Sequence, residues 1–418
     1  MSIRRVRRRR AAATLIAAAM TSGCAGAGWQ LGGGILAGPR AVAAALGDLR
    51  PNARIPLDEL PRMDPPHHPR MCCAFGMDLE VDFAGLEIPF FQLGNVVGVA
   101  ELGPHAYELP TGALDGEGNG LLYTCRGGWI DTAHVRELAD NVLFLAMHMA
   151  SRLGTGTTIE IPGHGGLTTI RVAPIPDAEI ARDGALVIAA ALAAWTAYRI
   201  SIWHEVSSWY GNEMVAGFSE RPSAFSLEDL YSNALGVRLG IAILEERGFA
   251  SDTQYDLTIE AFLRAALERL EVQSRETSRS IMTSLDGTWW DSSRRLPDNL
   301  LVRRRAFPGE MDRVLPWRAE AAFDHAHLPV VLRAACGGAA TRWLVVPTEV
   351  GRHAVRDLVR ITWIPEAWAQ ESLPRGASGE REVDERQLEV LVDAVHEALA
   401  LALGPGFDQP GPLAGGSD

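Results

Sequence analysis

Four long segments of the chain repeat apolar residues at the three- and four-residue spacing of a helix that packs against a core. They predict helices at residues 131–153, 185–210, 226–247 and 259–275. The second segment is apolar nearly all round as far as Arg199, which indicates a core helix with neighbours on every side. Because Arg199, His204 and Glu205 interrupt it, we do not interpret it as a membrane span.

Shorter segments have the alternating or β-branched pattern of strands. Before the helical centre, these segments predict strands at 78–83, 89–91 and 96–99, and a hairpin that joins 157–161 to 167–172. After the helical centre, they predict strands at 330–332, 343–346 and 358–363. A final helix is predicted from Asp384 to Leu403, with Gln387 completing a capping box. The chain is therefore expected to be α+β, with a helical central core and short β segments before it and in the C-terminal third.

The same pattern divides the chain into a leader, a body and a tail. We assign 1–23 to a signal peptide, 24–70 to a Gly/Ala/Pro-rich tether and irregular approach, and 71–403 to a single α+β domain. Within that domain, 183–285 is the helical centre and 306–403 the mixed C-terminal part. Residues 404–418 are rich in Gly and Pro and are predicted to be disordered.

The leader has the composition of a bacterial export signal. Six arginines within the first ten residues precede an apolar run of about ten residues, too short to span a bilayer. The ending Thr21-Ser22-Gly23-Cys24 resembles a lipobox, so we predict that Cys24 is lipidated and holds the protein at the periplasmic face of the outer membrane. The alternative is cleavage near Gly23, which would release a periplasmic protein. The paired arginines leave both the Sec and the twin-arginine routes open.

Charge limits the partners of this protein. The chain has no lysine, so its 39 basic residues are all arginines, which excludes Schiff-base and Walker lysines. The formal net charge is −13, and without the six leader arginines 33 basic residues face 52 acidic ones, a balance of −19. Such a surface repels phosphate backbones, and we expect no nucleic-acid partner.

Cysteine use fits an oxidising compartment. Besides Cys24 the chain has Cys72, Cys73, Cys125 and Cys336. A bond between the adjacent Cys72 and Cys73 would be strained, so we predict that one of them pairs with Cys125. The alternative is that some of the four are buried thiols.

Polar side chains gather near the ends of three predicted helices. His204 and Glu205 lie near the end of the apolar helix, where buried ionisable groups need partners. They resemble the first half of a His-Glu-x-x-His zinc motif, but Ser208 stands in place of the second histidine, so a metal would need ligands from elsewhere. At the start of the first helix, His134 follows Asp131 by three residues, so the two can share a helical face.

The third helix begins with a similar group. Ser226 and Asp229 have the spacing of a capping box, Glu228 suits the positive end of the helix, and Asn233 lies one turn beyond Asp229. We predict that the three helix ends meet at one polar pocket. Glu205 and His204 are its catalytic candidates; His134, His204, Glu228 and Asp229 its metal-ligand candidates; and Asp131, Ser208, Asn233 and Arg126 its supporting residues.

Three stretches, 123–139, 204–211 and 223–236, resemble the signature segments of a bacterial exported family known as domain of unknown function 4056. The resemblance implies an envelope protein, often with a lipoprotein-like leader, whose polar residues cluster in these stretches. Because the family's activity is not established, the resemblance assigns no catalytic residue.

Three functions fit these features. The first is a hydrolase in which zinc or another divalent metal lowers the pKa of a bound water. The second is a metal-free hydrolase or transferase with Glu205 and His204 as acid and base. The third is a non-catalytic envelope protein in which the polar residues only join helices. The convergence of three helix ends favours the first.

Overall fold

The fold is described from a computed structural model, over residues 63–66, 70, 74–83, 86–89, 95–107, 117–163, 166–211, 220–246, 251–311, 313–366, 372–373 and 382–411. The leader with Cys24, most of the tether, and both Cys72 and Cys73 lie outside these residues. The export, lipid-anchor and envelope assignments therefore stay predictions from the sequence.

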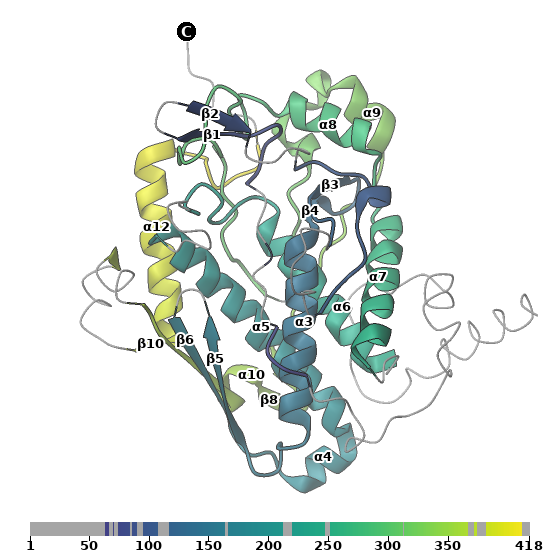
Figure 1. The fold of residues 1–418 in the computed structure, drawn as a ribbon, viewed down its shortest axis with the longest axis vertical. Helices are drawn as coiled ribbons and strands as arrows, with labels where there is room; N and C mark the ends of the chain where they lie inside the picture. Colours follow the sequence, from purple (N-terminus) through teal and green to yellow (C-terminus); the bar gives the residue numbers. More distant parts are fainter. Residues whose placement is uncertain are drawn as a thin grey trace, which may run out of the picture.

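Three helices form the centre of the α+β fold (Figure 1). They are α3 (Thr132–Ala150), α5 (Ala185–Trp209) and α6 (Asp229–Glu246). Each of the three packs against the other two. Two glycines of α6 allow its backbone to approach α3 closely: a Cβ at Gly236 would lie 2.3 Å from the Val135 carbonyl oxygen, and one at Gly240 would lie 2.8 Å from the Val142 Cβ. This close packing places the first turn of α6 beside the first turn of α3.

Helix α5 is the apolar helix predicted for the core. Among the described residues it is the one helix long and apolar enough to cross a membrane, and 83% of its apolar window is buried inside the fold. Its neighbours α3, α6 and α12 (Leu388–Leu403) supply that burial. A helix covered in this way is a core helix of the fold.

Further helices surround this centre. They are α4 (Asp177–Asp183), α7 (Asp252–Arg269), α8 (Arg275–Ser284), α9 (Val330–Cys336) and α10 (Val355–Leu358), with short 3-10 turns at Val99–Glu101, Ala319–Ala322, His325–His327 and Glu385–Gln387. The helix predicted at 259–275 begins earlier, because Ser251 caps it, and ends earlier, because Glu271 adopts a left-handed conformation with φ 61°. The Asp384–Gln387 capping box is confirmed, and the last helix ends at Leu403 as predicted.

The largest sheet joins the hairpin that precedes α5 to strands of the C-terminal third. Its antiparallel order is β10 (Val383–Asp384), β9 (Val359–Ile364), β6 (Gly166–Val172) and β5 (Thr157–Gly163). The hairpin β5–β6 is the predicted one, and β9 lies beside β6 with Ile170 opposite Ile361. Three two-stranded pairs complete the β structure: β1 (Glu80–Phe83) with β2 (Leu86–Pro89), β3 (Leu121–Thr124) with β4 (Gly128–Asp131), and β7 (Glu349–Val350) with β8 (His353–Ala354).

The hairpin β3–β4 lies between two hydrophobic clusters. Leu122 and Ile130 pack into the large cluster formed by the central helices, whereas Tyr123 and Trp129 pack into a second cluster around Trp289. All residues of both strands are buried, as expected of a short strand pair covered on both faces. Strand β4 leads directly into α3, so the hairpin fixes where α3 begins.

Some predicted strands are wrong. The β-branched run at 330–332 belongs to helix α9, where Leu332 and Cys336 are buried one turn apart; this packing overrides the strand propensity of its valines. At 343–346 the chain makes only a single bridge, between Leu344 and Val314. Likewise, Val96 makes one bridge to Leu121, and β2 ends at Pro89, with Phe90 and Phe91 outside the described residues.

The predicted tail and the predicted disulfide also need correction. Residues 404–411 fold back onto the body: Phe407 is buried, and its carbonyl oxygen accepts a 2.9 Å hydrogen bond from the Arg305 backbone N–H. Residues 412–418 lie outside the described part. Cys125 forms a disulfide with Cys336 and not, as predicted, with Cys72 or Cys73. The packing of α9 against α8, which itself lies on β3, brings Cys336 to Cys125.

Candidate functional site

The first turn of α3 is tied to the first turn of α6. Asp131 caps α3, accepting a 2.7 Å hydrogen bond from the Ala133 N–H. The Asp131 backbone N–H donates to the Ser232 hydroxyl on α6 at 2.9 Å. These two contacts fix the position of His134, in the first turn of α3, along the axis of α6.

One of the two hydrogen bonds of the capping box predicted for Ser226 and Asp229 is present. The backbone N–H of Ser226 donates to Asp229 Oδ2 at 2.7 Å, and the Ser226 hydroxyl donates to Glu228 Oε2 at 2.8 Å. With Oδ2 held in this way, the other oxygen of Asp229 lies 3.2 Å from Nε2 of His134. The cap therefore orients the carboxylate toward α3.

The end of α5 completes the cluster. Oε2 of Glu205 accepts a 2.7 Å hydrogen bond from the backbone N–H of Phe225, in the turn before α6. One ligand-type atom each from His134, Glu205 and Asp229 lies within 4.8 Å of the others. All three side chains are buried. We call this group the three-helix cluster, and it brings together the three helix ends that the sequence indicates.

The remaining candidates take different places around this cluster. The ring of His204 is 6.5 Å from that of His134, centre to centre, and His204 is half-buried. Glu228 is buried beside Asp229 but is not one of the three converging groups. Ser208 donates to Glu220 at 3.1 Å. Arg126 instead pairs with Glu271 at 2.5 Å, at the turn of β3–β4, and so does not support the cluster.

The cluster concentrates negative charge inside the protein. Burial is the main cause that raises the pKa of Glu205, and the charge of the neighbouring Asp229 adds to it. Burial also raises the pKa of Glu228, with smaller contributions from the charges of Asp229 and Asp131. The nearby cation is Arg305, and burial lowers its pKa to about 10 despite the three carboxylates of Asp229, Glu228 and Glu205. Carboxylates in such a place need a proton or a cation to be stable.

Arg305 is a site residue that the sequence analysis missed. Its guanidinium donates to the carbonyl oxygens of Pro222 at 2.6 Å, Ala224 at 2.8 Å and Asn299 at 3.0 Å. It thereby holds the turn that precedes α6 and contributes positive charge without pairing directly to a carboxylate. Nothing in its local sequence, an arginine run at 303–305, distinguishes it from a surface arginine.

Two polar groups next to the cluster lack partners. Among the described residues, Oε1 of Glu228 and both amide atoms of Asn233 have no hydrogen-bond partner, although these side chains are 1% and 0% exposed. Buried polar groups are nearly always paired, and exceptions indicate a missing water, ion or ligand. The side chains of Glu228 and Asn233, at the start of α6, can therefore bind a water, an ion or a ligand.

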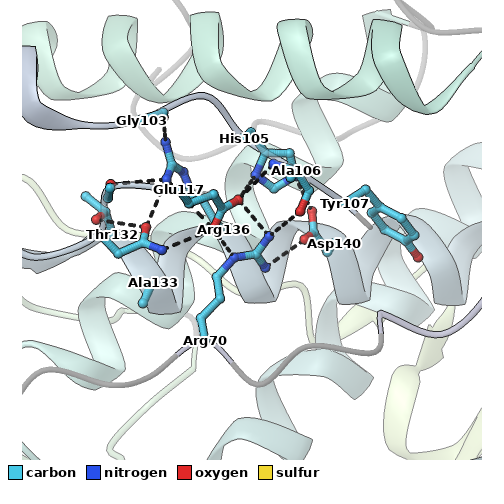
Figure 2. Close-up of polar contacts among 12 residues, drawn as sticks. Arg70, Gly103, His105, Ala106, Tyr107, Glu117, Thr132, Ala133, Arg136 and Asp140 are labelled. Carbon is cyan, nitrogen blue, oxygen red and sulfur yellow. Dashed lines mark hydrogen bonds and ion pairs between the residues drawn. The ribbon is translucent and has the colours of Figure 1, made fainter. Parts of the chain in front are cut away.

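A second buried charge network lies further along α3 (Figure 2). Arg70 contacts Glu117 at 2.5 Å and Asp140 at 2.8 Å, and His105 lies between the same two carboxylates, at 2.7 Å and 3.1 Å. The hydroxyl of Tyr255 donates to Asp140 at 2.5 Å. No local sequence pattern indicates this network, because its members are far apart along the chain. It clamps the segment before β3 onto α3 and α7.

Figure 2 also shows Arg136 reaching the same carboxylate group. Its guanidinium donates to Asn119 Oδ1 at 2.9 Å and to the Gly103 carbonyl oxygen at 2.7 Å, and lies 3.8 Å from Glu117. Positive and negative groups are therefore nearly balanced here, in contrast to the three-helix cluster. A balanced, hydrogen-bonded network is typical of a structural role.

The contribution of this network to folding stability is expected to be greatest within a limited pH range. Burial alone would lower the pKa of His105, but Asp140 and Glu117 raise it above its ordinary value of 6.5. Burial would raise the pKa values of Glu117 and Asp140, but His105 and Arg70 lower them below their ordinary values of 4.5 and 3.8. The histidine's contribution is present below pH 6.5 and is lost as pH rises through its folded pKa. The carboxylates' contributions are present above pH 4.5 and are lost on acidification. The network therefore stabilises most between about pH 4.5 and 6.5.

Urea unfolding at a series of pH values tests this expectation. The difference in unfolding free energy between the wild type and His105→Gln is expected to be greatest in that range and to shrink toward alkaline pH. A difference that stays constant from pH 5 to pH 9 would contradict the assignment of a charged His105.

Comparison with known proteins gives one match. No curated protein and no solved structure matches this chain. A family model described as "Protein of unknown function (DUF4056)" matches residues 60–318, which include His134, Glu205, Asp229 and Arg305. Since that match covers more than half of the chain, the protein belongs to the DUF4056 family.

Proposed function

We propose that the three-helix cluster binds a divalent transition metal, through Nε2 of His134 and one carboxylate oxygen each of Glu205 and Asp229, and that the protein is a metal-dependent hydrolase. The observation that carries this proposal is the convergence of three ligand-type atoms within 4.8 Å inside the fold. With bonds of about 2.1 Å, ligand atoms in a tetrahedral shell lie about 3.4 Å apart. The 3.2 Å from His134 to Asp229 already fits, and small side-chain movements would bring Glu205 into place.

The charge of the cluster supports a cation as its occupant. Two carboxylates of the cluster and the adjacent Glu228 are buried together. Arg305 directs its hydrogen bonds to backbone carbonyl oxygens rather than to these groups. A divalent cation would offset both the burial and the neighbouring negative charge that raise the pKa values of Glu205 and Glu228.

The donor set suits hydrolysis. Three protein ligands leave a coordination position open, and a metal bound there lowers the pKa of water, as in known catalytic zinc sites. His204 lies beside His134 and is the more exposed of the two, so it can exchange a proton with solvent during a reaction. The Ser226 N–H holds Oδ2 of Asp229, which leaves Oδ1 facing Nε2 of His134 as the second ligand atom.

A second candidate is acid–base catalysis without a metal. Glu205 and Asp229 offer carboxylate oxygens within 4.8 Å of each other, and burial, followed by the charge of Asp229, raises the pKa of Glu205. Two neighbouring carboxyls that share one proton can act as acid and base, with His204 as a further proton carrier. A proton and a metal ion would compete for the same place, so metal analysis separates the two candidates.

Elemental analysis of the purified full-length protein is the first test. We expect close to one equivalent of zinc, manganese or iron per chain, and we expect a chelator to lower the melting temperature and the same metal to restore it. Protein purified without metal that shows no thermal shift with any of the three ions at neutral pH would overturn the metal proposal and favour the acid–base site.

A further inference from the structure

A separate pocket lies where the segment 294–304 meets the end of α12. It has a volume of about 110 Å³, enough for several waters or one small anion, and three of its eight lining residues are arginines: Arg294, Arg303 and Arg304. None of the lining residues is acidic. In a chain of formal net charge −13, such a pocket is locally opposite in sign to the protein as a whole.

The three arginines differ in how their charges are compensated. Arg294 is neutralised by Asp291 at 3.2 Å and Asp298 at 2.6 Å. Arg303 donates to the Gly287 carbonyl oxygen at 2.5 Å, and Arg304 to that of Gly411 at 2.9 Å. Within the described part of the chain, neither Arg303 nor Arg304 forms an ion pair with a carboxylate.

Arg304 is the unusual member. It is 1% exposed, and its Nε has no hydrogen-bond partner among the described residues. Burial, together with the neighbouring charge of Arg303, lowers its pKa, and Asp408 offsets this only in part. Asp408 itself is paired with His396 at 3.1 Å. A guanidinium rarely loses its proton, so an anion beside Arg304 would stabilise this buried charge.

The turn after α12 forms the other wall of this pocket. Gly404 and Gly406 adopt φ values of +80° and +79°, conformations that other residues rarely take, and they direct the chain back so that Pro405 and Phe407 line the pocket. Phe407 is buried, so this wall is packed against the body. The pocket is therefore a formed feature rather than a gap between surface side chains.

We propose that this pocket binds a small oxyanion of the phosphate or phosphomonoester class through Arg303 and Arg304. Planar guanidinium groups match the paired oxygens of such anions, and each arginine has N–H groups left over from its single hydrogen bond to a carbonyl oxygen. The site shares no residue with the three-helix cluster, so it stands whether or not that cluster binds metal.

Calorimetric titration of the full-length protein with inorganic phosphate and, separately, with glycerol 3-phosphate tests the proposal at constant ionic strength. We expect binding of at least one of them, weakened at least about tenfold by Arg303→Gln, since a charged hydrogen bond is worth about 1.5–3 kcal/mol. Tighter binding of glycerol 3-phosphate would assign the pocket to a phosphomonoester, and equal or tighter binding of inorganic phosphate to the free ion.

The matched control is Arg333→Gln, which removes the same charge from an exposed arginine whose guanidinium donates to a carbonyl oxygen. Binding is expected to be unchanged in this variant. Because Arg303 is half-buried, its replacement is expected to leave the fold in place. Arg304→Gln serves as a second variant with a larger expected loss of binding. If neither anion binds the wild type, or if the Arg303 and Arg333 variants bind equally, the proposal is wrong.

Discussion

Asp229→Asn and His134→Ala are each expected to lower the affinity for divalent metal by more than about 100-fold, because each removes one of three ligands; even outer-shell changes cost 10–100-fold. Competition with a chromogenic chelator measures this affinity, and circular dichroism shows whether the variants are folded. In metal-free protein, Asp229→Asn is expected to melt no lower than the wild type. The substitution removes one of two adjacent buried carboxylates, and the amide oxygen of the new asparagine can still accept the hydrogen bond from the Ser226 N–H.

The control for these variants is His353→Ala. His353 pairs with Glu179 at 2.9 Å, a histidine–carboxylate contact like that of His134 and Asp229, but it lies on β8, outside the three-helix cluster. Its removal is expected to leave metal affinity unchanged. Unchanged affinity in Asp229→Asn and His134→Ala would instead assign the bound metal to another part of the chain.

Loss of the Cys125–Cys336 disulfide is expected to destabilise the protein by about 5 kcal/mol in the chain-entropy model, because the bond closes a loop with a sequence separation of 211. The bond joins the β3–β4 turn to α9 in the C-terminal third, and β4 leads from that turn into α3. Cys336→Ser and Cys125→Ala should therefore each unfold at a much lower denaturant concentration than the oxidised wild type. Chemical denaturation with and without a reductant measures the difference.

The double variant is the control for this prediction. If the two cysteines act only through their shared bond, Cys125→Ala with Cys336→Ser should lose about as much stability as either change alone, and reductant should have little further effect on it. Equal stability of the oxidised wild type and both single variants would show that the bond contributes nothing.

The proposed sites differ in whether they lie within the segment that the family model matches. The match covers residues 60–318, so the three-helix cluster and Arg305 lie inside the matched segment. Cys336 and the C-terminal wall of the arginine pocket lie beyond it. The metal experiments therefore address a feature of the matched family segment, whereas the disulfide and anion experiments address the full chain.

Local pattern was enough to predict the central helices and their ends. Apolar spacing predicted α3, α5 and α6, because a helix buried on one or more faces repeats its apolar residues at a fixed interval. Short-range capping chemistry predicted Asp131 at the start of α3 and the Ser226–Asp229 contact at the start of α6. The need of buried ionisable groups for partners was sufficient reason to expect that these helix ends would meet.

Contacts between distant parts of the chain were decided only by the tertiary structure. Arg305 reaches the turn before α6 from 81 and 83 residues away, and Cys336 reaches Cys125 across 211 residues. The partners of Arg70 lie 47 and 70 residues further along the chain. Such pairs leave no periodicity in the sequence, since their positions depend on how whole helices pack. For the same reason, strand propensity at 330–332 gave way to helix α9, whose buried face is determined by its neighbours.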